Sequence, residues 1–287
     1  MGSGYQSFLR NSYWILRHGK SIPNQTGVIV SSLVRELVVY LSDYVCVWQE
    51  NGVLEDYQLA SDGVEQARVA GELFLKALHL NLFIQESFPF CVVQFCVFPN
   101  KQLELRENNI GLENVCICYS PFSRTTHTAK VAASVLDIPL EPPQCKGVTL
   151  LVFPSGHRNF VVVHDLRERF FGSSFELKSH DKYSETWALD AKDPFLQLEG
   201  GESVADVATR LTSALALMES EFEGCTVLIV SHGDPLQILQ TIMNAAKEDG
   251  RSEGNDLVSR VEAVRLSSVL SQHRQFALDT AELRRLV

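Results

Sequence analysis

The sequence predicts an α/β fold, a three-layer α/β/α sandwich whose central sheet is mainly parallel. Short, near-continuously apolar runs indicate strands that are covered on both faces. Amphipathic helical patterns alternate with these runs, which is typical of strand–helix–strand units. The chain has 287 residues, of which 45% are hydrophobic, and this is enough apolar surface for one large core. We therefore expect a single domain over residues 1–287.

The predicted strands are rich in β-branched or aromatic residues. The first reads "YWIL", the second "VCICY", and the last "TVLIV". The run "FVVV" is a further candidate of the same kind. In chain order these four predicted strands are 13–16, 115–119, 160–163 and 226–230.

Helical patterns occupy the sequence between and after the strands. Their predicted ranges are 61–78, 123–136, 203–218 and 234–246. Asp62 with Glu65 has the spacing of a capping box, and Ser203 stands at the start of the third pattern. Asp234 is placed as the cap of the last helix, with Pro235 at its first helical position, where proline is tolerated.

Charge and cysteine content exclude several classes of protein. The net charge of −10 repels phosphate backbones, so we expect no nucleic-acid partner. The seven cysteines form no CxxC pair, which argues against a zinc or thioredoxin-like site and for free thiols in a reducing compartment. The longest apolar stretch, 88–98, is too short to span a bilayer. The amino terminus lacks the features of a signal peptide. We expect a soluble, cytoplasmic protein without a membrane partner.

Polar residues follow each predicted strand directly. Arg17 and His18 come after the first strand, Arg124 after the second, and His232 after the last. In open α/β sheets, ligands bind outside the carboxyl ends of the strands. We therefore expect these four side chains to lie at one edge of the sheet. Two arginines and two histidines there form a site for a compact dianion, because guanidinium donors match phosphate oxygens.

His18 is the candidate nucleophile of this site. A neutral imidazole is an accepted covalent catalyst, and Arg17 disfavours the protonated ring. Glu168 is the candidate proton donor, because a nearby phosphate dianion would raise the pKa of its carboxyl group. Asp165, directly after His164, is the competing acid.

Five segments resemble motifs of the histidine phosphatase superfamily, in the phosphoglycerate mutase-like branch with the RHG motif. They occur in the order that the family has. They read "LRHGKSIPN", "YSPFSRTTHTA", "LRERFFG", "GGESVADVATR" and "VSHGDPLQ".

The resemblance implies a role for each matching residue, with no metal and no cofactor. His18 is the phosphorylated nucleophile and Glu168 the proton donor. The phosphoryl oxygens are held by Arg17, Arg124 and His232. Ser21 and Asn24 lie near the phosphate or on the loop that shapes its pocket. Another branch uses an acid in a His-Asp pair on the late strand, where this chain has His232-Gly233-Asp234, so Glu168 is preferred to Asp165.

The resemblance implies a metal-independent phosphatase that hydrolyses a small phosphorylated metabolite through a phosphohistidine, as a monomer or homodimer. Phosphoglycerate mutase activity is the first alternative. However, Lys20 and Pro23 stand where mutases usually carry Glu and Trp. The second alternative is a catalytically impaired protein that binds phosphate or a partner.

Three stretches are more apolar and cysteine-rich than surface connections usually are. They are 33–50, 83–109 and 144–160, and we interpret them as insertions into the domain. His127 lies on the same helical face as Arg124, so it either touches the site or packs beside it. The remaining histidines are assigned no role: His79, His157, His180 and His273.

Overall fold

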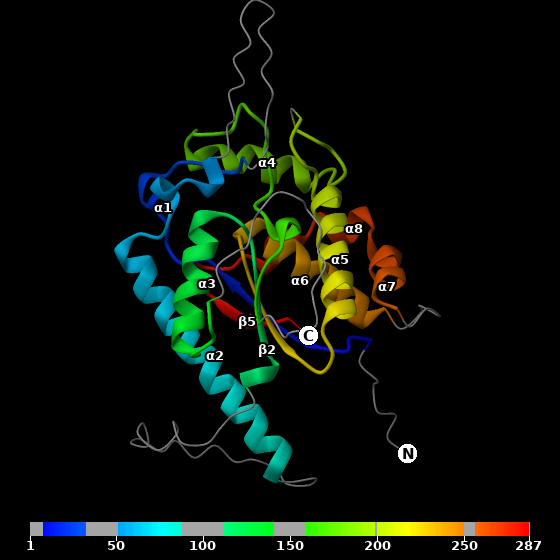
Figure 1. Cartoon of the computed structure of the whole chain (residues 1–287). Helices are drawn as coiled ribbons and strands as arrows, with labels where there is room; N and C mark the ends of the chain where they lie inside the picture. Colours follow the sequence, from blue (N-terminus) through cyan, green and yellow to red (C-terminus); the bar gives the residue numbers. More distant parts are fainter. Residues whose placement is uncertain are drawn as a thin grey trace, which may run out of the picture.

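A computed structural model describes residues 8–32, 51–87, 112–140, 159–198, 200–249 and 256–286. A five-stranded sheet lies at its centre with helices on both faces (Figure 1). The strand order across the sheet is β3-β2-β4-β1-β5. The strands are β1 (Ser12–Arg17), β2 (Val115–Tyr119), β3 (Phe160–Val162), β4 (Thr226–Ser231) and β5 (Leu283–Arg285).

The sheet is mainly parallel, as the sequence predicts. Strand β4 pairs in parallel with both β1 and β2, and β2 pairs in parallel with β3. Strand β5 runs antiparallel to β1 at the edge. The four parallel strands correspond to the four predicted ones, and their carboxyl ends therefore meet at one edge of the sheet.

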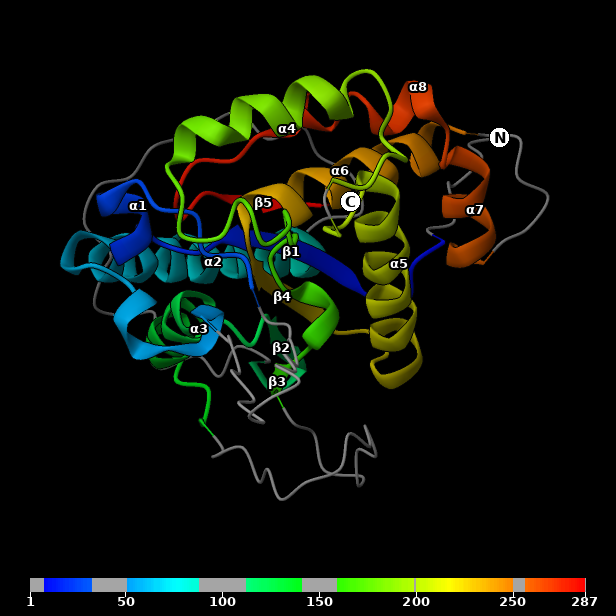
Figure 2. The same cartoon turned by 90° about the horizontal axis from the view of Figure 1, so that it is seen from above.

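Two helical layers cover the two faces of the sheet (Figure 2). One face packs against α2 (Ser61–Ser87) and α3 (Ser123–Val135), with Leu16, Ile117 and Leu228 as the strand contribution. The other face presents Ile15, Cys118 and Ile229 to the second layer. This layer comprises α5 (Val204–Glu221), α6 (Gly233–Glu248), α7 (Leu257–Val264) and α8 (Ser267–Leu270).

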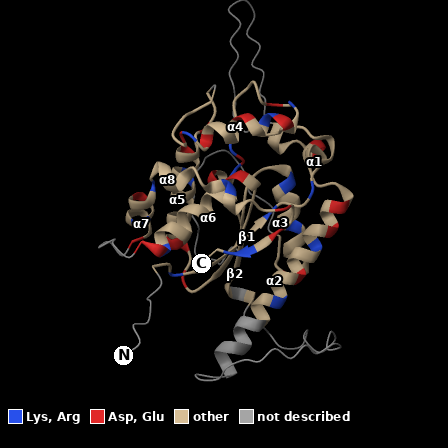
Figure 3. Cartoon of the chain, turned by 180° about the vertical axis from the view of Figure 1, so that it is seen from behind, with Lys and Arg blue, Asp and Glu red and all other residues tan. Residues whose placement is uncertain are grey.

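Two short helices, α1 (Ile22–Thr26) and α4 (Tyr183–Asp190), lie together at one end of the molecule (Figure 1). Basic and acidic residues are interspersed along α2 (Figure 3). On α2, Arg68 pairs with both Glu65 and Glu72. None of the helices in the described residues has the length and apolar character needed to cross a membrane.

The helix starts partly follow the sequence prediction. Ser203 caps α5, and its hydroxyl accepts a hydrogen bond from the backbone N–H of Asp206 in a capping box. The predicted capping box at Asp62 is wrong. Because α2 begins at Ser61, Asp62 is already its second helical residue and cannot be the cap. Asp62 pairs instead with Lys20 at 3.2 Å, and this ion pair joins the start of α2 to the loop after β1.

The start of α6 also differs from the prediction. The helix begins at Gly233 with His232 as its cap residue, so Asp234 lies in the first turn and Pro235 is the third helical residue. The carboxylate of Asp234 contacts Arg169 at 3.2 Å rather than capping the helix. Strand β4 thus passes into α6 without a loop, which fixes His232 at the strand end.

Gly19 allows the loop after β1 to pack closely on α2. A Cβ atom at position 19 would lie 2.3 Å from the carbonyl oxygen of Gly63. No side chain fits at that distance. Gly19 is therefore needed where the backbone after His18 packs against the first turn of α2.

The predicted insertions fall almost entirely outside the described residues. All of 33–50 lies outside them. Of 83–109, residues 83–87 form the end of α2, and of 144–160 only 159–160 are described, with Phe160 in β3. The single-domain assignment and its insertions stay predictions. On either side of 33–50, Ser32 and Asn51 both donate to the buried carboxylate of Glu176, at 2.8 and 2.9 Å.

Candidate active site

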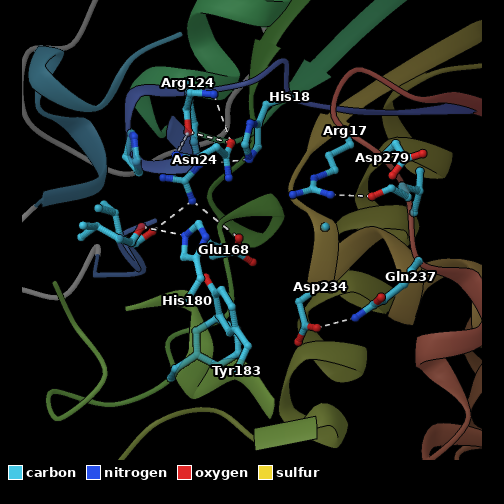
Figure 4. A pocket seen from close by; sticks show the side chains of 18 of the residues that line it. Arg17, His18, Asn24, Arg124, Glu168, His180, Tyr183, Asp234, Gln237 and Asp279 are labelled. Atoms are coloured by element: carbon cyan, nitrogen blue, oxygen red, sulfur yellow. Dashed lines mark hydrogen bonds and ion pairs between the residues drawn. The ribbon is translucent and has the colours of Figure 1, made fainter. Parts of the chain in front are cut away.

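A cavity of about 390 Å³ opens at the carboxyl ends of the parallel strands. Figure 4 shows side chains from elements far apart in sequence turned toward it. Arg17 and His18 come from the end of β1 and Arg124 from the first turn of α3. Glu168 follows a 3₁₀ turn (His164–Leu166) after β3, and Tyr183 begins α4.

His18 is a buried, neutral imidazole. Its Nδ1 atom lies 2.8 Å from the carbonyl oxygen of Gly19, so Nδ1–H donates there and Nε2 keeps its lone pair. The Nε–H of Arg124 donates to that Nε2 atom at 3.2 Å. Burial, followed by the charges of Arg124 and Arg17, holds the pKa of His18 well below its usual range. Nε2 is therefore available as a nucleophile near neutral pH.

Arg124 is held rigidly but keeps one donor free. It is 4% exposed, its Nη2 donates to the carbonyl oxygen of Val30 at 3.0 Å, and the same atom lies 3.5 Å from Glu168 Oε2. Arg124 Nη1 is buried and has no hydrogen-bond partner among the described residues. Arg17 is similar: Nη1 donates to Leu278 O, and the buried Nε has no partner there.

His232 lies behind His18 rather than among the residues that line the cavity. The two imidazole rings meet edge to face with centroids 5.3 Å apart. Nε2 of His232 shares a hydrogen bond of 2.8 Å with Ser120 Oγ. Nδ1 lies 3.7 Å from Glu168 Oε2 and lacks a hydrogen-bond partner in the described part of the chain. Burial, then the charge of Arg124, lowers the pKa of His232 far below its usual value.

Glu168 is a carboxyl group poised to exchange a proton near neutrality. Burial raises its pKa to about 7, against the opposing influence of Arg124. The backbone N–H of Arg169 donates to its Oε1 at 3.0 Å. The competing acid, Asp165, does not line the cavity, and its carboxylate pairs with Arg167 at 3.3 Å.

Three buried nitrogen atoms near His18 have no hydrogen-bond partner among the described residues. They are Arg124 Nη1 and Arg17 Nε, whose side chains line the cavity, and His232 Nδ1 behind the His18 ring. Native proteins satisfy most buried polar groups, so this cluster indicates a place for a ligand with several acceptor oxygens. Within the described ranges, His, Cys, Asp and Glu side chains form no group that could hold a metal ion. The arrangement suits a tetrahedral oxyanion whose central atom faces His18 Nε2.

Ser21 and Asn24 both line the cavity, as the resemblance implies. They form the capping box of α1, in which Asn24 Oδ1 accepts hydrogen bonds from Ser21 N at 3.1 Å and Ser21 Oγ at 2.8 Å. This reciprocal contact fixes the wall of the cavity beside His18. His127 is not among the lining residues.

The sequence analysis did not predict a second wall of the cavity, which we call the aromatic wall. His180, Tyr183 and Trp187 line it, and their rings follow one another with centroids 5.3 and 5.4 Å apart. His180, which was assigned no role, has Nε2 2.9 Å from the carbonyl oxygen of Val28. The spacing of three and four residues in "SHDKYSETW" is the signal that places these rings on one helical face.

Comparison with known proteins adds to this geometry. Residues 154–268 match the model of the histidine phosphatase superfamily (branch 1). The match covers less than half of the chain and lies in its second half. The resemblance predicted from the sequence motifs is thereby confirmed, and the matched residues include Glu168 and His232. A search of curated proteins gives no match.

Solved structures of similar fold include a hydrolase and a phosphatase of mycobacteria. A protein described as mycobacterial hydrolase 1 is 17% identical, with a TM-score of 0.51 over 95% of this chain and 87% of its own. An open-reading-frame product of Mycobacterium tuberculosis is 20% identical (TM-score 0.51, 95% and 89%). A mycobacterial glucosyl-3-phosphoglycerate phosphatase in complex with VO3 is 15% identical (TM-score 0.52, 95% and 90%). At these identities the likeness shows the fold, and it confirms the predicted α/β architecture.

Proposed function

We propose that this superfamily member is a metal-independent phosphatase that hydrolyses a small phosphorylated metabolite through a phosphohistidine on His18. The observation that carries the proposal is the set of three unpartnered buried nitrogens near His18, whose Nε2 keeps its lone pair and accepts a hydrogen bond from Arg124. A phosphoryl group has the oxygens that these donors need. The VO3 complex of the similar mycobacterial phosphatase supports the same class of ligand.

In the first half-reaction, Nε2 of His18 forms a bond to phosphorus while the bond between phosphorus and the leaving oxygen breaks. The Nε–H of Arg124 gives up its hydrogen bond to His18 Nε2 and donates instead to a phosphoryl oxygen. The charge on the equatorial oxygens is stabilised by Arg17, Arg124 and His232. Glu168, protonated because burial raises its pKa to about 7, gives its proton to the leaving oxygen.

In the second half-reaction, water attacks phosphorus on the face opposite His18. The new oxygen–phosphorus bond forms as the nitrogen–phosphorus bond breaks, and Glu168 accepts the proton from the water. Inorganic phosphate and the alcohol are the products, and His18 returns to its neutral form. Glu168 thus acts first as acid and then as base, which a pKa near neutrality permits.

Mutase activity is less well supported than hydrolysis. Lys20, at the position where mutases usually carry Glu, is engaged with Asp62 at 3.2 Å. Pro23 forms part of the first turn of α1. Neither residue provides the groups that the mutase motif has at these places.

The proposal is tested by hydrolysis of p-nitrophenyl phosphate with and without excess EDTA. We expect the wild-type kcat to be unchanged by the chelator, because nitrogen donors and not a metal ion bind the phosphoryl group. Asp165→Asn serves as the control variant, since Asp165 does not line the cavity, and we expect it to keep wild-type activity. Loss of activity with EDTA, or a wild-type chain inactive toward phosphate esters, would rule the proposal out.

A further inference from the structure

A fully buried ion network lies directly behind Glu168. Its centre is Arg169, which is 0% exposed. The guanidinium group binds Asp190 with two hydrogen bonds, of 2.7 and 2.9 Å, and Asp234 with a third of 3.2 Å. Its Nε donates to the carbonyl oxygen of Glu202 at 2.8 Å. All three nitrogens of this side chain thus donate hydrogen bonds, four in total, that hold the backbone next to Glu168.

The network joins Glu168 to the aromatic wall of the cavity. Asp190 is the last residue of α4, and the same eight-residue helix carries Tyr183 and Trp187. Asp190 is 1% exposed, so its bidentate contact with Arg169 is shielded from water. The same helix therefore lines the cavity with Tyr183 and Trp187 and binds Arg169, the neighbour of Glu168, through Asp190.

A second chain of contacts closes the network on the opposite side of the cavity. Asp234 accepts a hydrogen bond from Gln237 (Figure 4). Gln237 in turn accepts one of 2.9 Å from Arg274. The guanidinium carbon of Arg274 lies 3.7 Å from the ring centroid of Trp187. The contacts thus start at Asp190 of α4 and pass through Arg169 to Asp234 and Gln237 of α6. They return through Arg274 to Trp187 of α4.

Resting on the proposed function, we propose that Arg169 and Asp190 are positioning residues that hold Glu168 where it protonates the leaving group, and that they tie this position to α4. Neither side chain lines the cavity, so both act through the backbone that joins Arg169 to Glu168. A misplacement of about 1 Å can cost about a hundredfold in rate when a group must meet a reacting atom. The bidentate Arg–carboxylate geometry is the most orientation-specific ion pair available to a protein.

Other groups also face Glu168, and one of them, Arg210, restrains its loop as well. Arg124, Arg17, Tyr183 and Asp234 lie on the cavity side, and His232 lies behind His18. Arg210 donates to the backbone oxygens of Asp165, Arg167 and Glu168 at 2.6, 3.1 and 3.3 Å. The contact of Arg124 with the Glu168 carboxylate is 3.5 Å long and is shared with the phosphoryl site. Arg169 is the neighbour that ties this loop to α4, through its two hydrogen bonds to Asp190.

The test compares two esters of nearly equal shape, benzyl phosphate and p-nitrophenyl phosphate, in Asp190→Asn. Benzyl alcoholate needs a proton to leave, whereas p-nitrophenolate leaves with little help. We expect kcat/KM for benzyl phosphate, which reports the phosphorylation step, to fall about 10- to 100-fold and kcat/KM for p-nitrophenyl phosphate to fall less than about threefold. A merely structural role would lower both rates equally, and this result would overturn the proposal.

Two further variants keep the test decisive. Arg169→Lys keeps a positive charge between the two carboxylates but loses the bidentate guanidinium contact. This variant should therefore fold even if Asp190→Asn does not. We expect it to show the same selective loss of activity toward benzyl phosphate. Glu219→Gln is the matched control: Glu219 is another buried carboxylate, bound by Tyr13 at 2.7 Å and far from the cavity. It should lower stability without changing the ratio of the two rates. Inactivity of the wild-type chain toward both esters would refute the proposed function, and with it the positioning role.

Discussion

Replacing His18 with alanine lowers kcat for p-nitrophenyl phosphate by about four orders of magnitude or more. His18 is the nucleophile of the proposed mechanism, because its Nε2 keeps a lone pair near the unpartnered donors of Arg124 and Arg17. Removal of a covalent nucleophile leaves only the residual rate that charge stabilisation and binding provide. Steady-state phosphate release measures the effect.

His127→Ala is the control for this experiment. His127 lies on the same helix as Arg124 but does not line the cavity. We expect its kcat to stay within about threefold of wild type, as for substitutions away from a site. Retention of a tenth or more of wild-type activity by the His18 variant would mean that another group attacks phosphorus.

Replacing Glu168 with glutamine lowers kcat/KM for benzyl phosphate by about 10²- to 10⁴-fold, the usual contribution of a general acid. The amide keeps the shape and the hydrogen bond from the backbone of Arg169 but has no proton to give. In contrast, kcat/KM for p-nitrophenyl phosphate should change much less, since it reports the phosphorylation step and this leaving group needs little protonation. The ratio of the two rates therefore reports the loss of the acid separately from damage to the site.

The pH dependence follows from the same carboxyl group. Burial raises the pKa of Glu168 to about 7, and the active form for ester cleavage is the protonated one. In the wild type, kcat/KM for benzyl phosphate should therefore fall as the pH rises above about 7, approaching tenfold per unit. The Glu168→Gln variant should lack this descending limb. Persistence of the limb in the variant would assign it to another group.

The parallel strands and the residues at their ends could be predicted from sequence. Continuous apolar runs mark β1, β2 and β4, and a strand must turn polar where it leaves the core, which marks His18 and His232. Strand β5 could not be found this way, because Leu283–Arg285 is a three-residue edge strand with two arginines. Its pairing with β1 depends on tertiary contact rather than on local pattern.

The aromatic wall and the ion network were harder to predict, for a different physical reason. Tyr183 and Trp187 belong to α4, which lies beyond the sheet, so no strand end marks them. Arg169 next to Glu168 reads in sequence as one more charge in a solvated run. Its burial depends on the carboxylates of Asp190 and Asp234, which lie 21 and 65 residues away along the chain.

The most direct test of the mechanism is to stop the reaction within one turnover and locate the phosphoryl group on the enzyme. Wild-type protein mixed with p-nitrophenyl phosphate is quenched in alkali, where phosphohistidine survives, digested and examined by mass spectrometry. The mechanism predicts one phosphoryl group per chain on the peptide that contains His18, bound to Nε2, and none in the His18→Ala variant. A phosphoryl group on another residue, or an enzyme that turns over without ever carrying one, would contradict it.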